Sequence, residues 1–191
     1  MALWVSKAYR GGFLGAHADP LIGLGTAPLD DPFFRAAAIE QLGEDRLEVP
    51  ITTDICGDSE SHSTRLDYES ADSIKKARLH RKVATSVFFE SNGGRTSGTD
   101  ASIPEIRLDV AEPDLDIGNV ETVLSDLETT CYFLNAEGSR YHFSLKPNVN
   151  KLLADREAGI TKPRIDERIL SEISQIFAKG SDLERVLFPQ K

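Results

Sequence analysis

The chain has 191 residues, of which 40% are apolar and 7% aromatic, and its formal net charge is −9. This composition is typical of a globular protein with a core of its own, and the acidic surface excludes a generally basic nucleic-acid binder. The sequence has no run of about 18 uncharged apolar residues and no secretion signal. We therefore expect a cytoplasmic protein without membrane contact.

Residues 1–71 carry many glycines and prolines between short apolar pieces, which predicts a loop-rich N-terminal arm. One helix is indicated within the arm, over residues 31–43, because Asp31 is a suitable N-cap, Pro32 suits the first helical position and Gly43 closes the pattern. The segment "EVPITTDI" predicts at most an edge strand, since its proline lacks an amide hydrogen. The polar segment "GDSESHST" predicts a hinge before the second half of the chain.

Three helical patterns follow the hinge. The segment "SIKKARLHRKVATSVFFES" predicts one long helix that ends at the glycines of "NGGRTSGTD". Ser102 and Glu105 form a capping box for a short second helix. Asp116 is the expected N-cap of a third helix, whose apolar face has the spacing i, i+3, i+4, i+7 and consists of Val120, Val123, Leu124 and Leu127.

The stretch "CYFLNAEGSRYHFSL" directly after the third helix alternates apolar and polar residues on both sides of Gly138, which predicts a β-hairpin. Three short helices cannot cover their shared apolar faces on every side, and a hairpin closes the open flank. The order helix, helix, helix, hairpin is typical of a winged helix-turn-helix domain, here over residues 72–147. The predicted fold class is therefore mainly α with a small β-hairpin (α+β), with a winged-helix core and flanking helices.

Residues 148–191 contain two more helical patterns and form a predicted C-terminal helical extension. The second pattern has one apolar face, made of Ile165, Ile169, Ile173, Ile176 and Phe177, and Gly180 lies at its end. The chain finishes with the strand-like run "DLERVLFPQK", which has no apparent partner strand. We therefore expect the chain to be a piece of a longer protein.

Catalytic motifs are absent from the sequence. No phosphate-binding loop of the G-x-x-x-x-G-K-[ST] type and no G-x-S-x-G nucleophile motif occurs, and Cys56 and Cys131 lack the spacing of a zinc site or a disulfide framework. The couple His17 and Asp19 suggests a small enzyme only weakly, because no nucleophile motif lies near it. We expect no catalytic residue, no metal and no cofactor.

Basic side chains cluster in "KKARLHRK", and two more follow in the hairpin region. This candidate nucleic-acid-binding set consists of Lys75, Lys76, Arg78, Arg81, Lys82, Arg140 and Lys146. The helix cluster suits contacts to phosphates or an arginine directed at a nucleotide held by another domain, but a solvated helix face paired with carboxylates is the competing interpretation. The third helix has no lysine or arginine, and residues 100–146 carry ten acidic and three basic residues, so groove recognition through this helix is not expected.

Three strings carry a resemblance to a known family, namely "LDYESADSIKKARLHRKVATSVFFESNGG", "IPEIRLDVAEPDLDIGNVETVL" and "YHFSLKPNVNKLLADREAGI". They resemble the C-terminal part of a family of large AAA+-type P-loop ATPases that are encoded beside DNA methyltransferases, in loci similar to restriction or phage-defence systems. The likeness is strongest from about Arg65 to Lys179. It implies an intracellular ATP-driven machine that acts near DNA, with a winged helix after its ATPase core. The core itself is not in this chain, and the resemblance transfers no catalytic residue.

Two hypotheses follow. In the first, the chain is a non-catalytic winged-helix module for protein-protein or interdomain interaction within the larger ATPase, or with a partner protein. In the second, it is a nucleic-acid-binding module that uses the basic helix and the wing, with DNA as a partner.

Overall fold

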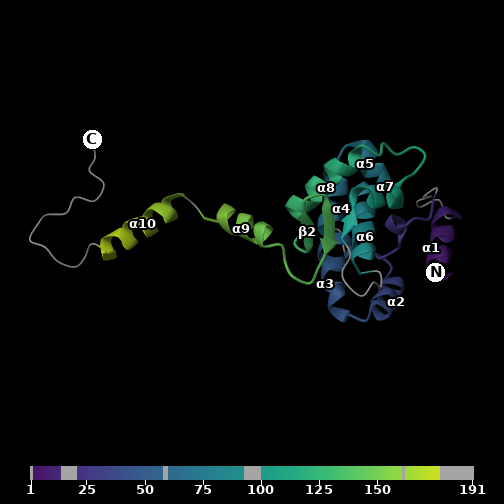
Figure 1. The fold of residues 1–191 in the computed structure, drawn as a ribbon, viewed down its shortest axis with the longest axis horizontal. Helices are drawn as coiled ribbons and strands as arrows, with labels where there is room; N and C mark the ends of the chain where they lie inside the picture. Colours follow the sequence, from purple (N-terminus) through teal and green to yellow (C-terminus); the bar gives the residue numbers. More distant parts are fainter. Residues whose placement is uncertain (1, 14–20, 58–59, 93–99, 161, 177–191) are drawn as a thin grey trace, which may run out of the picture. The chain divides into compact units, whose positions relative to one another are not determined.

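The structure is a computed structural model that describes residues 2–13, 21–57, 60–92, 100–160 and 162–176. It divides into two compact units, Met1–Lys151 and Leu152–Lys191, and the boundary falls within the helix that follows the small sheet. The described residues are mainly helical and include one small antiparallel sheet (Figure 1). The predicted α+β class is thus confirmed at this level.

The first part of the chain is almost entirely helical. Its elements are α1 (Ala2–Phe13), the 3-10 helix η1 (Leu24–Thr26), α2 (Pro32–Leu42), the 3-10 helix η2 (Asp45–Leu47), α3 (Glu48–Pro50), the π-helix η3 (Ile51–Cys56), α4 (His62–Glu69), α5 (Asp72–Ala77) and α6 (Leu79–Asn92). After these come β1 (Ala101–Ser102), α7 (Ile103–Val110), α8 (Asn119–Thr130), β2 (Leu134–Glu137), β3 (Arg140–Phe143), α9 (Val149–Ala158) and α10 (Lys162–Ile176).

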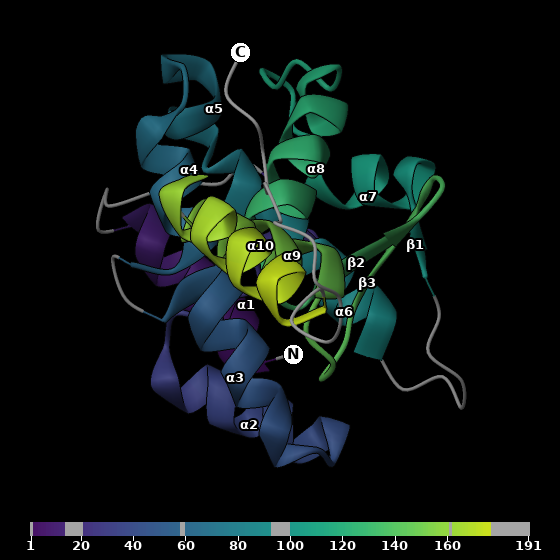
Figure 2. The same cartoon turned by 90° about the vertical axis from the view of Figure 1, so that its left-hand side faces the viewer.

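The predicted hairpin is present, and it belongs to a three-stranded sheet. The strand order is β1-β3-β2, with antiparallel pairing throughout. In the hairpin, Glu137 pairs with Arg140, and Gly138 in the turn has a φ of 65°, which favours glycine. Figure 2 shows β1 alongside β3, next to the start of α7. The two-residue strand β1 was not predicted, because a strand this short has no periodicity of its own.

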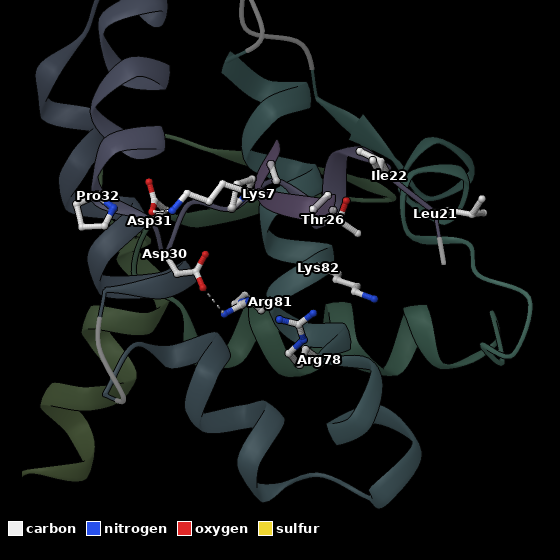
Figure 3. Close-up of a pocket in the computed structure, with 14 residues that line it drawn as sticks. Lys7, Leu21, Ile22, Thr26, Asp30, Asp31, Pro32, Arg78, Arg81 and Lys82 are labelled. Atoms are coloured by element: carbon white, nitrogen blue, oxygen red, sulfur yellow. Dashed lines mark hydrogen bonds and ion pairs between the residues drawn. The ribbon is translucent and has the colours of Figure 1, made fainter. Parts of the chain in front are cut away.

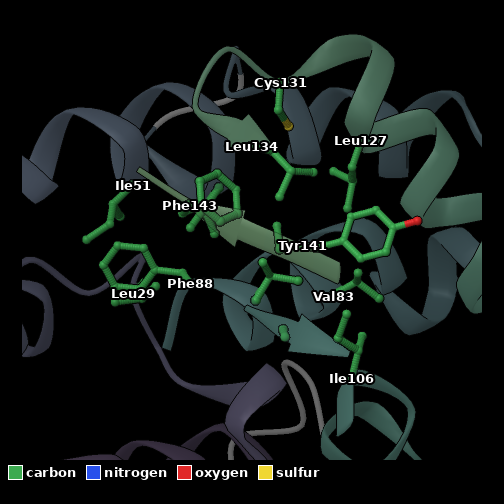
Figure 4. Packing of buried hydrophobic residues seen from close by; sticks show 14 of the residues in the cluster. Leu29, Ile51, Val83, Phe88, Ile106, Leu127, Cys131, Leu134, Tyr141 and Phe143 are labelled. Carbon is green, nitrogen blue, oxygen red and sulfur yellow. The ribbon is translucent and has the colours of Figure 1, made fainter. Parts of the chain in front are cut away.

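Helix α6 runs through the core and is buried on nearly all sides. Its largest core side chain, Phe88, is fully buried and lies edge-to-face with Phe143 of β3, with ring centroids 6.3 Å apart. Figure 4 shows this ring among buried side chains from η3, α7, α8 and the sheet. The sheet is also bonded to α6 directly, since the Phe143 amide donates to Ser91 Oγ at 3.1 Å.

The described residues of the N-terminal arm predicted for residues 1–71 are part of this same core, so a domain boundary at residue 72 is wrong. Leu29, Ile51 and Ile55 are at most 1% exposed and belong to one cluster with the core residues of α6. Trp4 of α1 packs against the rings of Phe34 and Phe89, at 6.0 and 6.4 Å between centroids. Short apolar pieces between glycines and prolines have no regular spacing, which is why they were interpreted as loops.

Two glycines explain how η1 approaches the core closely. A side chain at Gly23 would place its Cβ 2.4 Å from the Asp109 carbonyl oxygen, and one at Gly25 would meet the Lys82 carbonyl oxygen at 2.9 Å. Both distances are shorter than van der Waals contact. The glycines that suggested a loop are therefore needed for tight packing of this segment against α6 and α7.

The predicted edge strand "EVPITTDI" is helical, as α3 and η3. Its β-branched residues favour a strand, but Ile51 and Ile55 lie four residues apart and both reach the core. The Thr52 hydroxyl donates to the Glu48 carbonyl at 2.9 Å, as expected within a helical turn. Burial of one helical face thus overrides the local strand preference.

The expected hinge "GDSESHST" is also wrong for the residues that the structure describes. Ser61 precedes α4 and is buried, and His62 opens this helix. The fully buried Asp54 carboxylate accepts from His62 Nδ1 at 2.7 Å and from the backbone amides of Tyr132 and Phe133 at 3.1 and 2.7 Å. One carboxylate therefore ties η3, α4 and the entrance to β2 together.

The predicted long helix from residue 72 is divided into α5 and α6 at Arg78, whose φ of 52° and ψ of 47° lie in the left-handed region. Asp116 is not the N-cap of α8, because the capping position is Gly118. Asp116 instead accepts a hydrogen bond from the Gly118 amide at 3.0 Å, in the loop before the helix.

The predicted ends of the helix over residues 31–43 and the predicted start of the helix after Ser102 are confirmed. Asp31 Oδ1 accepts from the Phe34 amide at 2.9 Å and Gly43 closes α2 with a φ of 72°. Glu105 accepts from the Ser102 amide at 2.9 Å in the capping box of α7. The two C-terminal helical patterns appear as α9 and α10, whereas Phe177, Gly180 and the strand-like run lie outside the described residues.

Candidate functional site

The basic side chains predicted on one helix do not share one exposed face. Lys75 and Lys76 are exposed on α5, and the Lys75 ammonium lies 4.7 Å from the centroid of the Tyr68 ring. Lys82, in contrast, is 3% exposed, and its ammonium is bonded to the Glu112 carboxylate. The interpretation of Lys82 as a solvated phosphate contact is therefore wrong, because its ammonium is enclosed and paired on the buried side of α6.

The two basic residues predicted in and after the hairpin are exposed. Arg140 begins β3 opposite Glu137, and Lys146 follows the sheet. The main-chain amide of Lys146 donates to Ser144 Oγ at 3.2 Å, which orders this turn. These side chains remain accessible to a ligand, but acidic groups lie close by, Glu137 being directly across the strands.

Arg78 and Arg81 line a cavity of about 390 Å³ together with Lys82 (Figure 3). This cavity is a candidate site separate from the exposed basic side chains of α5. The walls come from α1, from residues 21–32 and from the junction of α5 and α6. The lining residues are Lys7, Ala8, Leu21, Ile22, Gly25, Thr26, Ala27, Pro28, Asp30, Asp31, Pro32, Arg78, Arg81 and Lys82. Four of these side chains are cationic and two are carboxylates.

The charges of the cavity are arranged in pairs. Lys7 is bonded to Asp31, and Arg81 Nη1 lies 3.4 Å from Asp30 Oδ2. The hydrogen bond from Lys7 holds the pKa of Asp31 below its usual value, with a further contribution from the Phe34 amide. The site is thus polar and preorganised, with its bases oriented by neighbouring acids.

The outward face of α8 forms a second candidate surface, of opposite sign. Its exposed residues are Glu121, Thr122, Ser125, Glu128 and Thr129, which follow one another at helical spacing opposite the buried apolar face. Arg107 of α7 donates to Glu121 Oε1 at 2.5 Å, and this hydrogen bond lowers the pKa of Glu121. We call these five residues the acidic face.

Polar residues inside the core are engaged by specific partners. His80 is fully buried, with Nδ1 3.0 Å from Asp67 Oδ1 and Nε2 3.4 Å from Asp126 Oδ2. Ser86 Oγ donates to Asp109 Oδ2 at 2.5 Å, and burial raises the pKa of Asp109. These contacts join α4, α7 and α8 to α6, which is a structural role.

The structure offers no metal centre among the residues that it describes, since no group of three or more His, Cys, Asp or Glu side chains converges there. Burial raises the pKa of Cys56 to about 12 and raises that of Cys131 as well, so neither thiol is reactive at neutral pH. His17 and Asp19 lie outside the described residues. None of the described helices is both long and apolar enough to cross a membrane.

Several residues of the cavity were missed by the sequence analysis. Lys7 and Asp30 carry no motif, Asp31 was recognised only as a helix cap, and Glu112 was counted only as one of the acidic residues. Lys7, Asp30 and Asp31 join Arg78 and Arg81 in the cavity lining from sequence separations of about 50 to 70 residues, and Glu112, which lies outside the lining, pairs with Lys82, so no local pattern signals the cavity. Pairing of opposite charges across these segments was the only available signal, and a single sequence does not identify the pairs.

Comparison with known proteins adds no identification. No family model, no curated protein and no solved structure matches this chain.

Proposed function

We propose that residues 79–143 form a winged helix-turn-helix. The proposal is supported by the element order α6, β1, α7, α8, β2, β3 and by the sheet order β1-β3-β2. In such a domain α6 is the first helix, α7 and α8 form the helix-turn-helix, and the hairpin of β2 and β3 is the wing. The short β1 between the first two helices, which completes the sheet, favours this assignment over three helices with an unrelated hairpin.

We further propose that this domain is a non-catalytic interaction module whose acidic face binds a basic protein surface. The observation that carries the proposal is the outer face of α8, the position from which a winged helix enters a major groove. Carboxylates at Glu121 and Glu128 repel a phosphate backbone and attract lysine and arginine side chains. The acidic face therefore selects a protein partner over DNA.

The resemblance of residues 65–179 to the C-terminal part of AAA+-type ATPases supports a place for this module in a larger ATP-driven protein of a DNA-associated defence system. In that setting the partner is another domain of the ATPase or a protein bound to it. The chain itself is proposed to hydrolyse no ATP, and phosphate release by the purified chain measures this directly.

Site-specific photocrosslinking tests the interaction. A benzophenone amino acid at Ser125, in the middle of the acidic face, is expected to give a protease-sensitive, nuclease-resistant adduct in cells that naturally contain the protein. The adduct should disappear when Glu121→Lys and Glu128→Lys are added. The matched control carries the same group at Gln41, which is exposed on α2. A nuclease-sensitive adduct, or none at Ser125, contradicts the proposal.

Nucleic-acid binding is the second candidate, favoured by the exposure of Lys75, Lys76, Arg140 and Lys146. Fluorescence anisotropy with a labelled 20-base-pair duplex at about 50 mM salt separates the two candidates, because phosphate contacts are strongest at low salt. We expect no saturable binding by the wild type and a gain of binding in Glu121→Lys/Glu128→Lys. Tight wild-type binding that is lost in Lys75→Glu/Lys76→Glu would replace the protein-interaction proposal with the DNA-binding one.

A further inference from the structure

We propose that the cavity lined by Lys7, Arg78 and Arg81 is a binding site for a small anion that carries phosphate groups. The space of about 390 Å³ lies within the range of small-molecule pockets, ~300–1,000 Å³. Its lining includes four cationic side chains from two segments, α1 and the junction of α5 and α6. This site is independent of the acidic face and of the partner proposed for it.

The charge of the cavity contrasts with that of the whole chain. The chain has a net charge of −9, yet the cavity lining holds Lys7, Arg78, Arg81 and Lys82 against Asp30 and Asp31. In Figure 3 Arg81 extends toward Asp30, Lys82 extends to the opposite side, and the Arg78 guanidinium lies between them in this view. Two guanidinium groups close together suit phosphate, because each binds two of its oxygens in parallel.

The backbone at Arg78 is a second and independent sign of a binding role. Arg78 is the one non-glycine residue with a positive φ among the residues that the structure describes, at the position after α5 where glycine is favoured. A left-handed conformation is unfavourable for a non-glycine residue, because the Cβ crowds the backbone. The long cation at this strained position lines the cavity, which places it within reach of a ligand there.

Lys82 and Arg81 differ in how firmly each is held by its neighbouring carboxylate. Lys82 and Glu112 are both largely buried, with side-chain exposures of 4% and 13%, so this pair holds the ammonium in place in the cavity wall. The pair between Arg81 and Asp30 is looser, at 3.4 Å and with exposures of 26% and 54%. A phosphate group can therefore take the place of Asp30 on Arg81 at little cost, since an exposed ion pair is weak. Asp30 is a competitor of the ligand.

Competition between Asp30 and the ligand predicts opposite changes in affinity when Arg78 and Asp30 are substituted. Arg78→Gly removes the guanidinium from the cavity, so the variant loses affinity. Asp30→Asn removes the competing charge, so it gains affinity. If Arg78 and Asp30 served only the fold, the two substitutions would not change the affinity in opposite directions.

Isothermal titration calorimetry with pyrophosphate at about 20 mM salt measures the effects. We expect saturable binding by the wild type that weakens as salt is added. Arg78→Gly should weaken it about tenfold or more, as expected for a charged hydrogen bond, and Asp30→Asn should strengthen it several-fold. Lys76→Gln, which removes an exposed cation of α5 outside the cavity lining, is the matched control and should leave the dissociation constant unchanged.

Citrate is the second probe in this experiment, because it carries comparable charge on carboxylates. Weaker binding of citrate than of pyrophosphate supports the phosphate assignment, and equal or tighter binding overturns it. Absence of saturable pyrophosphate binding, or equal losses in Arg78→Gly and Lys76→Gln, overturns the site itself.

Discussion

Helices α6 and α8 are neighbours in the same core, but they use their polar residues in opposite ways. α6 is enclosed, and its buried polar side chains are bonded to groups on other elements, as Lys82 is to Glu112 and Ser86 to Asp109. α8 buries one apolar face and presents the acidic face outward. The comparison teaches that a charged residue in a helical pattern does not by itself indicate a surface, because a central helix needs partnered polar groups to fix the elements around it.

The largest expected effect comes from Lys82→Ala, which leaves the Glu112 carboxylate without its ammonium in a mostly buried place. We expect a loss of about 3–5 kcal/mol in the free energy of unfolding, measured by urea denaturation. Lys76→Ala on exposed α5 is the control and should change stability by less than about 0.5 kcal/mol. The double variant Lys82→Met/Glu112→Leu should recover much of the loss; equal effects of Lys82→Ala and Lys76→Ala would contradict the contrast between enclosed and exposed charges.

A smaller loss is expected from Asp67→Ala. This carboxylate of α4 accepts from the amides of His80 and Arg81 at 2.8 and 3.2 Å, and so caps the start of α6 from another helix. Removal of a cap and of a buried charged acceptor should cost about 2–3 kcal/mol in thermal or urea unfolding. Asp114→Ala, at an exposed carboxylate, serves as the comparison. Similar stabilities of the two variants would show that α6 does not depend on this cap.

The half-buried Asp109 predicts a dependence on pH. Burial raises its pKa in the folded protein, so the folded state binds the proton more strongly than the unfolded state does. Its contribution to stability is therefore favourable below the unfolded value of about 3.9 and is lost as pH rises through the raised folded value. Asp109→Asn, which still offers an oxygen to Ser86, should gain stability relative to the wild type across that window. If the difference in the free energy of unfolding between Asp109→Asn and the wild type stays constant from about pH 3 to pH 7, the raised pKa of Asp109 is refuted.

The smallest effect on stability is expected at the acidic face. Glu128→Gln should change the free energy of unfolding by less than about 0.5 kcal/mol, because the side chain is exposed. The same substitution should reduce the crosslinking from Ser125 that is described above. A large loss of stability in Glu128→Gln would mean that α8 is enclosed in the same way as α6.

The predictions that held depend on short-range physical chemistry. The cap at Asp31, the capping box of Ser102 and Glu105, and the hairpin around Gly138 each follow from residues within about 10 positions of one another. The errors concern residues whose environment comes from distant segments. Ile51 and Ile55 are helical because their burial in the core outweighs their preference for strands. Lys82 is enclosed because Gly25 packs against it and Glu112 pairs with its ammonium.

The candidate site was predictable only in part for the same reason. The acidic face of α8 follows from the periodicity of one helix, and Arg78 and Arg81 were recognised as basic candidates. Their convergence with Lys7, Asp30 and Asp31 in one cavity was not predictable, because it depends on how α1 and the start of α2 pack near α6.

The sequence alone therefore determined the helical character of the chain, the positions of its caps and hairpin, and the charge of α8, since each depends on contacts within one element or between adjacent ones. The tertiary structure alone decided that residues 21–69 complete the core, that β1 joins the sheet, and which cations are enclosed and which remain exposed. Burial is a property of all the segments that pack around a residue. A local pattern records which side chains are present, and only the packed chain sets the surroundings in which they act.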